Sequence, residues 1–127
     1  MKEHYFENDF AEFWVENGIL FFVYKQGVTL DVEAAKRIVA DRVKAQKNVS
    51  YPVFCDMRGI KDIDKNARDY LAKEGSQLVK AVGVLIESPV TKIMGNFYLK
   101  INQPLTPTRM FTDKNNALEF LALHRNT

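Results

Sequence analysis

The pattern of apolar and polar positions along the chain alternates between strand-like and helix-like segments. Phe10 to Glu16 and Ile19 to Tyr24 are rich in aromatic and β-branched residues, and Asn17-Gly18 between them favours a tight type I′ turn. This pattern predicts an antiparallel hairpin at the start of the chain. After a break at Gly27, Asp31 is placed to cap a helix. The apolar positions of that helix recur at helical spacing: Val32, Ala35, Ile38, Val39 and Val43.

The middle of the chain predicts two further strands, each followed by a helix. Tyr51 to Asp56 is an apolar strand that ends in a carboxylate, and a short loop from Met57 to Ile63 leads to a helix from about Asp64 to Gly75. Ala81 to Ile86 is continuously apolar, which is typical of an interior parallel strand covered on both faces. Ser88 and Pro89 then favour the start of a third helix. One broad face of this helix carries Val90, Ile93, Met94, Phe97, Tyr98 and Ile101.

The last segment predicts a short strand and a closing helix. Arg109-Met110-Phe111 is the strand, and Asp113 caps a helix whose inward positions are Ala117, Leu118 and Leu121. Right-handed crossovers should make the later strands parallel. The sequence therefore predicts one α/β domain over residues 1–127, with its core at about 10–123: a mixed five-stranded sheet with an N-terminal β-hairpin and about four helices on both faces.

Composition narrows the classes of function. The 127 residues include 18 basic and 16 acidic side chains, a net charge of +2, and the lysines and arginines are scattered among acids rather than gathered in a stripe. Nucleic-acid binding is therefore not expected. A single cysteine, Cys55, excludes an internal disulfide and predicts a reducing, cytoplasmic setting. No apolar run approaches the ~20 residues that span a bilayer, so the chain is expected not to cross a membrane.

The end of the Tyr51 to Asp56 strand marks the expected working edge, since ligands and partners dock at the carboxyl ends of strands in open α/β sheets. Asp56, Asp62 and Asp64 there could hold Mg²⁺. Capping of the following helix by Asp64 is the favoured interpretation, and Arg58 and Lys61 supply the positive charge that a metal would supply. No metal and no cofactor are predicted.

Catalytic roles have simpler alternatives. Cys55 could be a nucleophile, but it lies in an apolar strand where a buried small side chain is ordinary. His4 and His124 lie near the two chain ends and are poorly placed to act as its base. Ser88 could accept a phosphate, although a Ser-Pro helix start uses that hydroxyl for capping. The prediction is a protein that is not an enzyme.

The third helix is the second candidate region. Met94, Phe97 and Tyr98 lie beside Gly95 and Asn96, which combines large apolar groups with a flexible joint and some polarity. Such a face can pack into the core, wall a ligand cleft against the sheet, or form a dimer surface. The sequence leaves these alternatives open.

The chain from about Phe13 to Leu121 resembles the STAS domains, the anti-sigma-factor antagonist fold, and within them the SpoIIAA-like branch related to the CRAL-TRIO lipid-binding lineage. Four segments carry the resemblance: Trp14 to Leu20, Pro52 to Asp56, Ala81 to Ile86, and Arg109 to Asp113 with Ala117 to Leu121.

The resemblance implies a non-enzymatic regulatory module that binds a partner protein or a small ligand. In the best-known STAS domains a serine of an Asp-Ser pair at the start of the second helix is phosphorylated. The corresponding segment here is Ile63-Asp64-Lys65-Asn66, so Lys65 takes the acceptor position and the phosphorylation switch is not expected.

Two functions follow as hypotheses. The first is protein recognition at the working edge, by a partner of unknown identity or a second copy of the chain. Its predicted partner-binding residues are Asp56, Arg58, Gly59, Asp64 and Lys65. The alternative is a carrier or sensor of a small apolar, lipid-like ligand between the third helix and the sheet, held by Met94, Phe97 and Tyr98.

Overall fold

The computed structural model describes residues 2–87 and 105–126. Its strands and helices, in chain order, are β1 (Glu3–Glu7), β2 (Ala11–Glu16), β3 (Ile19–Tyr24), β4 (Val28–Leu30), α1 (Val32–Gln46), β5 (Tyr51–Asp56), β6 (Ile60–Ile63), α2 (Lys65–Glu74), β7 (Val79–Leu85), β8 (Thr108–Phe111) and α4 (Lys114–Ala122).

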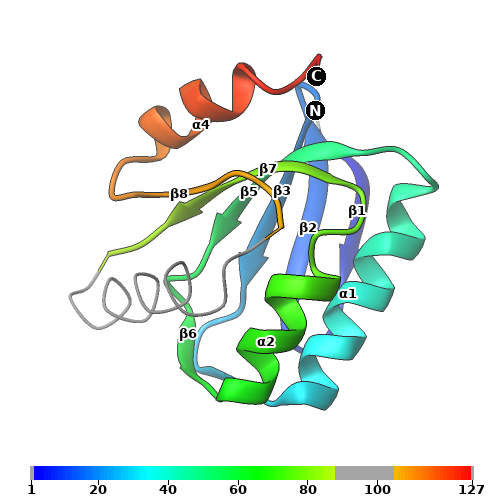
Figure 1. The fold of residues 1–127 in the computed structure, drawn as a ribbon, viewed down its shortest axis with the longest axis vertical. Helices are drawn as coiled ribbons and strands as arrows, with labels where there is room; N and C mark the ends of the chain where they lie inside the picture. Colours follow the sequence, from blue (N-terminus) through cyan, green and yellow to red (C-terminus); the bar gives the residue numbers. More distant parts are fainter. Residues whose placement is uncertain (1, 88–104, 127) are drawn as a thin grey trace.

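The main sheet is mixed, in the order β1-β2-β3-β5-β7-β8. Its first three strands pair antiparallel, whereas β3, β5, β7 and β8 pair parallel to one another. Helices α1 and α2 lie on one side of this sheet, and α4 crosses the other (Figure 1). The predicted α/β class with helices on both faces is confirmed.

The predicted hairpin is present as β2 and β3. Asn17 and Gly18 have positive φ angles of 53° and 75°, the backbone that a type I′ turn requires. The turn sets a register that stacks Phe13 on Phe22 on one face of the hairpin and Trp14 on Phe21 on the other. Each face of the sheet therefore carries one stacked aromatic pair at this hairpin.

Two strand predictions were incomplete. The sheet has a sixth strand, β1, at its edge; all five of its residues are exposed, so its sequence carries no one-sided apolar pattern. The segment from Met57 to Ile63, predicted as a loop, contains β6, which pairs parallel with β4 in a separate two-stranded sheet. Ile60 and Ile63 are buried with two exposed residues between them, and such spacing does not show the alternation of a strand.

The predicted helix starts are confirmed by capping hydrogen bonds. Asp31 accepts one from the backbone N–H of Ala34 at 2.8 Å, and Asp113 accepts one from that of Asn115 at 2.7 Å. Each carboxylate satisfies a donor that the first helical turn leaves without a partner. The predicted third helix, with Ser88, Met94, Phe97 and Tyr98, lies outside the described residues.

The core is divided between the two faces of the sheet. On the α1 and α2 side the buried side chains include Phe13, Leu20 and Phe22, together with Ile38 of α1. On the α4 side Trp14, Phe21, Phe54, Leu85 and Leu121 pack together. Within the described ranges no helix is long and apolar enough to cross a membrane.

Candidate functional site

Asp56 and Arg58 form an ion pair at the end of β5. The Arg58 guanidinium donates to both oxygens of the Asp56 carboxylate, from Nε at 2.9 Å and from Nη2 at 2.8 Å, and the backbone N–H of Arg58 donates to Oδ1 at 3.1 Å. These hydrogen bonds raise the pKa of Arg58. The carboxylate is buried and fully engaged within its own loop, whereas 46% of the Arg58 side chain is exposed.

Gly59 has a packing role at the same edge. A Cβ at this position would lie 2.6 Å from the carbonyl oxygens of Tyr24 and Lys25. The Gly59 carbonyl accepts a 2.7 Å hydrogen bond from the backbone N–H of Gly27. Close contact between two backbone segments therefore requires glycine here.

Asp64 and Lys65 begin α2. Asp64 accepts a hydrogen bond from the Ala67 backbone N–H at 2.8 Å, which confirms its predicted capping role. Lys65 is exposed and pairs with Asp69 one helical turn later, at 2.8 Å. Within the predicted partner-binding set, Asp56 pairs with Arg58. The hydrogen bonds and ion pairs of the described residues connect neither of these two side chains to Asp64 or Lys65.

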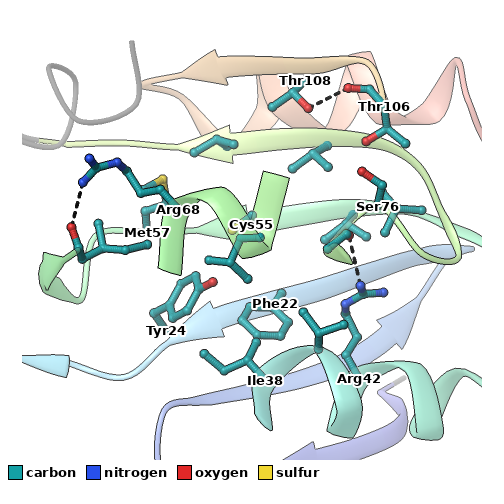
Figure 2. A pocket seen from close by; sticks show the side chains of 18 of the residues that line it. Phe22, Tyr24, Ile38, Arg42, Cys55, Met57, Arg68, Ser76, Thr106 and Thr108 are labelled. Carbon is teal, nitrogen blue, oxygen red and sulfur yellow. Dashed lines mark hydrogen bonds between the residues drawn. The ribbon is translucent and has the colours of Figure 1, made fainter. Parts of the chain in front are cut away.

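A cavity of about 140 Å³ lies on the α1 and α2 side of the sheet (Figure 2). Phe22 of β3, Cys55 of β5, Val84 of β7 and Met110 of β8 contribute to its floor. Its walls include Ile38 and Arg42 of α1, and Arg68 and Leu71 of α2. The sheet topology thus brings four strands and two helices together around one space.

Most of the described residues that line the cavity are apolar, and the polar ones among them are few. They comprise Tyr24, Cys55, Ser76, Thr106 and Thr108, besides the two arginines. Ser76 and Thr108 donate their hydroxyl protons to nearby backbone carbonyls. A mostly apolar space with a small number of polar groups is typical of sites for small molecules.

Arg42 is the most deeply buried of the charged groups along the cavity, with 5% of its surface exposed. Its guanidinium donates to the carbonyl oxygens of Gln77 at 3.0 Å and Gly75 at 3.1 Å, and also to the side-chain oxygen of Gln46. Burial lowers the pKa of Arg42 to about 10, so the group still carries its charge at neutral pH. All three of these acceptors are neutral.

Arg68 lies at the other end of the cavity, beside Met57 (Figure 2). Its Nη1 donates a 2.9 Å hydrogen bond to the carbonyl of Ile63, which fixes the guanidinium near the junction of β6 and α2. The described lining residues include these two arginines and no aspartate or glutamate. The charged side chains that line the cavity are therefore both cations, and the nearest carboxylate, that of Asp56, lies beside Cys55 and pairs with Arg58.

Cys55 lies near the middle of the cavity in Figure 2. Burial, reinforced by the negative charge of Asp56, raises the pKa of its thiol to about 12. The thiol is protonated at neutral pH, so little of the thiolate that nucleophilic chemistry requires is present.

The structure brings Asp56 and Arg58 together at the predicted working edge, and the sequence reasoning did not identify the cavity. Its predicted ligand-binding residues, Met94, Phe97 and Tyr98, lie outside the described residues. Arg42 carried a detectable signal, because it follows Ala35 and Ile38 at the spacing of one helix face and places a cation on an otherwise apolar stripe. Arg68 carried none, since α2 bears many charged residues.

The architecture is that of the SpoIIAA-like α/β proteins, as the resemblance in the sequence predicted. An uncharacterised DUF3478-family protein from Shewanella loihica PV-4 with a SpoIIAA-like fold matches 91% of this chain and 98% of its own, at 14% identity and a TM-score of 0.59. Residues 13–125 match the model of a domain of unknown function, DUF7793, and the chain belongs to that family.

Two other comparisons add nothing to the fold assignment. A protein of unknown function from Arthrobacter sp. FB24 is 24% identical over 86% of this chain and 89% of its own, but its TM-score is 0.33. No curated protein matches the sequence.

Proposed function

We propose that this protein is a non-enzymatic binding module that holds a small, mainly apolar ligand in the cavity between the sheet, α1 and α2. The observation that carries the proposal is the cavity itself, about 140 Å³ in volume and lined mainly by apolar side chains. An engineered apolar cavity of about 150 Å³ in another protein binds benzene, so this space suits a group of roughly one ring. A whole lipid is too large for it.

The position of Met57 supports a sensing role for this module. Met57 lines the cavity, and its two neighbours in the chain, Asp56 and Arg58, form the ion pair at the working edge. A ligand that displaces Met57 would shift the backbone that carries the exposed guanidinium of Arg58. Ligand occupancy could then be read at the surface by a partner protein.

The absence of a reactive thiolate supports a binding role over an enzymatic one. Cys55 is protonated at neutral pH because burial raises its pKa to about 12. The sequence has a single cysteine and so no internal disulfide, which is typical of proteins from reducing compartments and supports the cytoplasm as its location.

Ligand binding is tested by nuclear magnetic resonance with toluene as the probe. Toluene should perturb the backbone amide signals of cavity residues such as Cys55 and Val84. A Val82→Phe substitution should reduce this binding about tenfold or more, because the larger side chain fills the space above β7. Val49→Phe is the matched control, since Val49 is exposed and does not line the cavity. Equal toluene binding by both variants, or none by the parent protein, would refute the proposal.

Protein recognition at the working edge is a second candidate function. It is favoured by the Arg58 guanidinium, which is exposed yet held in place by two hydrogen bonds to Asp56. An ordered, exposed guanidinium is a common anchor at protein interfaces. Lys65, 72% exposed, is a further basic side chain at the start of α2.

Exchange of Lys65 for glutamate tests this candidate with little effect on folding. Lys65→Glu and Arg58→Gln should each weaken a partner recovered by cross-linking in cells, whereas Lys36→Glu on α1 should not. Lys36 is a suitable control because it is also exposed and basic, and it pairs with Glu33 on its own helix, as Lys65 pairs with Asp69. A partner recovered equally with all three variants binds elsewhere.

A further inference from the structure

The charges that face the cavity suggest which ligands it accepts. Two arginines and no acidic residues are among its described lining residues. In a partly shielded space, charges interact more strongly than they do in bulk solvent. A cationic ligand would be repelled there, and an anionic ligand would be attracted.

Arg42 places a positive charge at one end of the cavity, with its guanidinium already engaged by protein acceptors. Its guanidinium is directed to the carbonyl oxygens of Gly75 and Gln77 and to Gln46, which are dipoles and carry no net charge. A buried cation without an opposite charge is costly, and an anion nearby would lower that cost. Arg42 therefore acts over a distance.

Arg68 is the better candidate for direct contact. It is half-buried and lies at the opposite end of the cavity from Arg42 (Figure 2). The hydrogen bond to Ile63 holds it in this position. A planar guanidinium matches the two oxygens of a carboxylate, and such charge-assisted hydrogen bonds are among the strongest in proteins.

We infer that the cavity selects a monocarboxylate whose apolar body is about the size of one ring, with Arg68 contacting the carboxylate and Arg42 supplying additional positive potential. This inference rests on the proposed function and specifies its ligand. A doubly charged phosphate is disfavoured because the mostly apolar lining cannot replace its hydration. The apolar body lies over the floor formed by Cys55 and Val84.

Three probes of similar shape test the inference: phenylacetate, its neutral analogue phenylacetamide, and the cation 2-phenylethylammonium. Binding of each is measured by amide-signal titration at low salt. Phenylacetate should bind about tenfold or more tightly than phenylacetamide, because a hydrogen bond to a charged group is stronger than one to a neutral group. The cation should bind most weakly. Equal binding of the acid and the amide would overturn the inference while leaving the proposed cavity site intact.

Arg68 variants test the assignment of the contact. Arg68→Gln should reduce the preference for acid over amide to about twofold or less, with amide binding unchanged, and Arg68→Lys should retain most of the preference. Arg37→Gln is the control, because Arg37 is exposed on α1 and does not line the cavity. A preference that survives in Arg68→Gln would overturn the role of Arg68. If toluene leaves the cavity signals of the parent protein unperturbed, the proposed function itself fails.

Discussion

Arg42 of α1 donates a 3.1 Å hydrogen bond from Nη2 to the carbonyl oxygen of Gly75, the residue that ends α2. A second bond reaches the carbonyl of Gln77 at 3.0 Å, so one buried side chain satisfies two acceptors after the last turn of its neighbouring helix. The negative end of the α2 dipole faces this cation and offsets part of its burial cost. Arg42 thereby fixes the spacing of α1 and α2 along one wall of the cavity.

Replacing Arg42 by methionine should strongly destabilise the protein. Arg42→Met keeps an unbranched stem but leaves the carbonyls of Gly75 and Gln77 without this donor. The free energy of unfolding in urea should fall by about 2–4 kcal/mol. Arg37→Met, on the exposed side of the same helix, should change it by less than about 0.5 kcal/mol. Similar losses in the two variants would contradict the structural role of Arg42.

Gly59 should tolerate substitution less well than Gly27. A Cβ at Gly59 would lie 2.6 Å from two backbone carbonyl oxygens, so Gly59→Ala must push two segments apart. We expect this to lower the free energy of unfolding by about 2 kcal/mol or more. At Gly27 the space is open and only the positive φ of 81° opposes alanine, at about 1 kcal/mol. Thermal unfolding shows which of the two variants is less stable. A less stable Gly27→Ala variant would exclude the close contact at Gly59.

The Cys55 thiol should react slowly while the protein is folded. Its pKa is raised to about 12, so at pH 8 its thiolate fraction is far below that of an ordinary cysteine. Labelling by a disulfide reagent should be about a hundredfold or more slower in the folded protein than in denaturant. The rate should rise about tenfold per pH unit through pH 9 without reaching a plateau. A plateau near pH 9 would show that the thiol is not shielded from water.

The same shift has a consequence for stability. A folded-state pKa above the unfolded value means that the folded state binds the thiol proton more tightly. The resulting stabilisation is complete below about pH 8.5 and is lost as the pH rises toward 12. Cys55→Ala should therefore lose less stability than the parent protein over this range. If the free energies of unfolding of the two proteins change with pH in the same way, the thiol is not buried as described.

The fold was predictable where local sequence and tertiary structure agree. Asn17-Gly18 favours the backbone conformation of a tight hairpin turn. That turn fixes which side chains of β2 and β3 share a face. Edge strand β1 was not predictable, because exposure on both sides removes the pattern on which a strand assignment rests. The β4–β6 pair joins residues 32 or 33 positions apart and has no local signature.

The site was predictable only in part, for a related reason. The edge at Asp56 and Arg58 follows from the end of one strand, and a single strand is visible in the sequence. The cavity depends on how β5 and β7 align and on how far α1 stands from α2. Those spacings are set by long-range contacts such as the one between Arg42 and Gly75, which sequence periodicity does not report.

Asp64 allows the capping role and the partner-binding role to be separated. Its Oδ1 accepts the Ala67 backbone N–H at 2.8 Å, and asparagine can accept the same bond without the charge. Asp64→Ala should lower the free energy of unfolding by about 1 kcal/mol, and Asp64→Asn should change it by a few tenths. Measured in urea, equal losses in the two variants would show that the negative charge, rather than the cap, stabilises the start of α2. If a partner reads the carboxylate, Asp64→Asn should weaken its binding while stability is retained, and this outcome would assign Asp64 to the interface as well as to the helix.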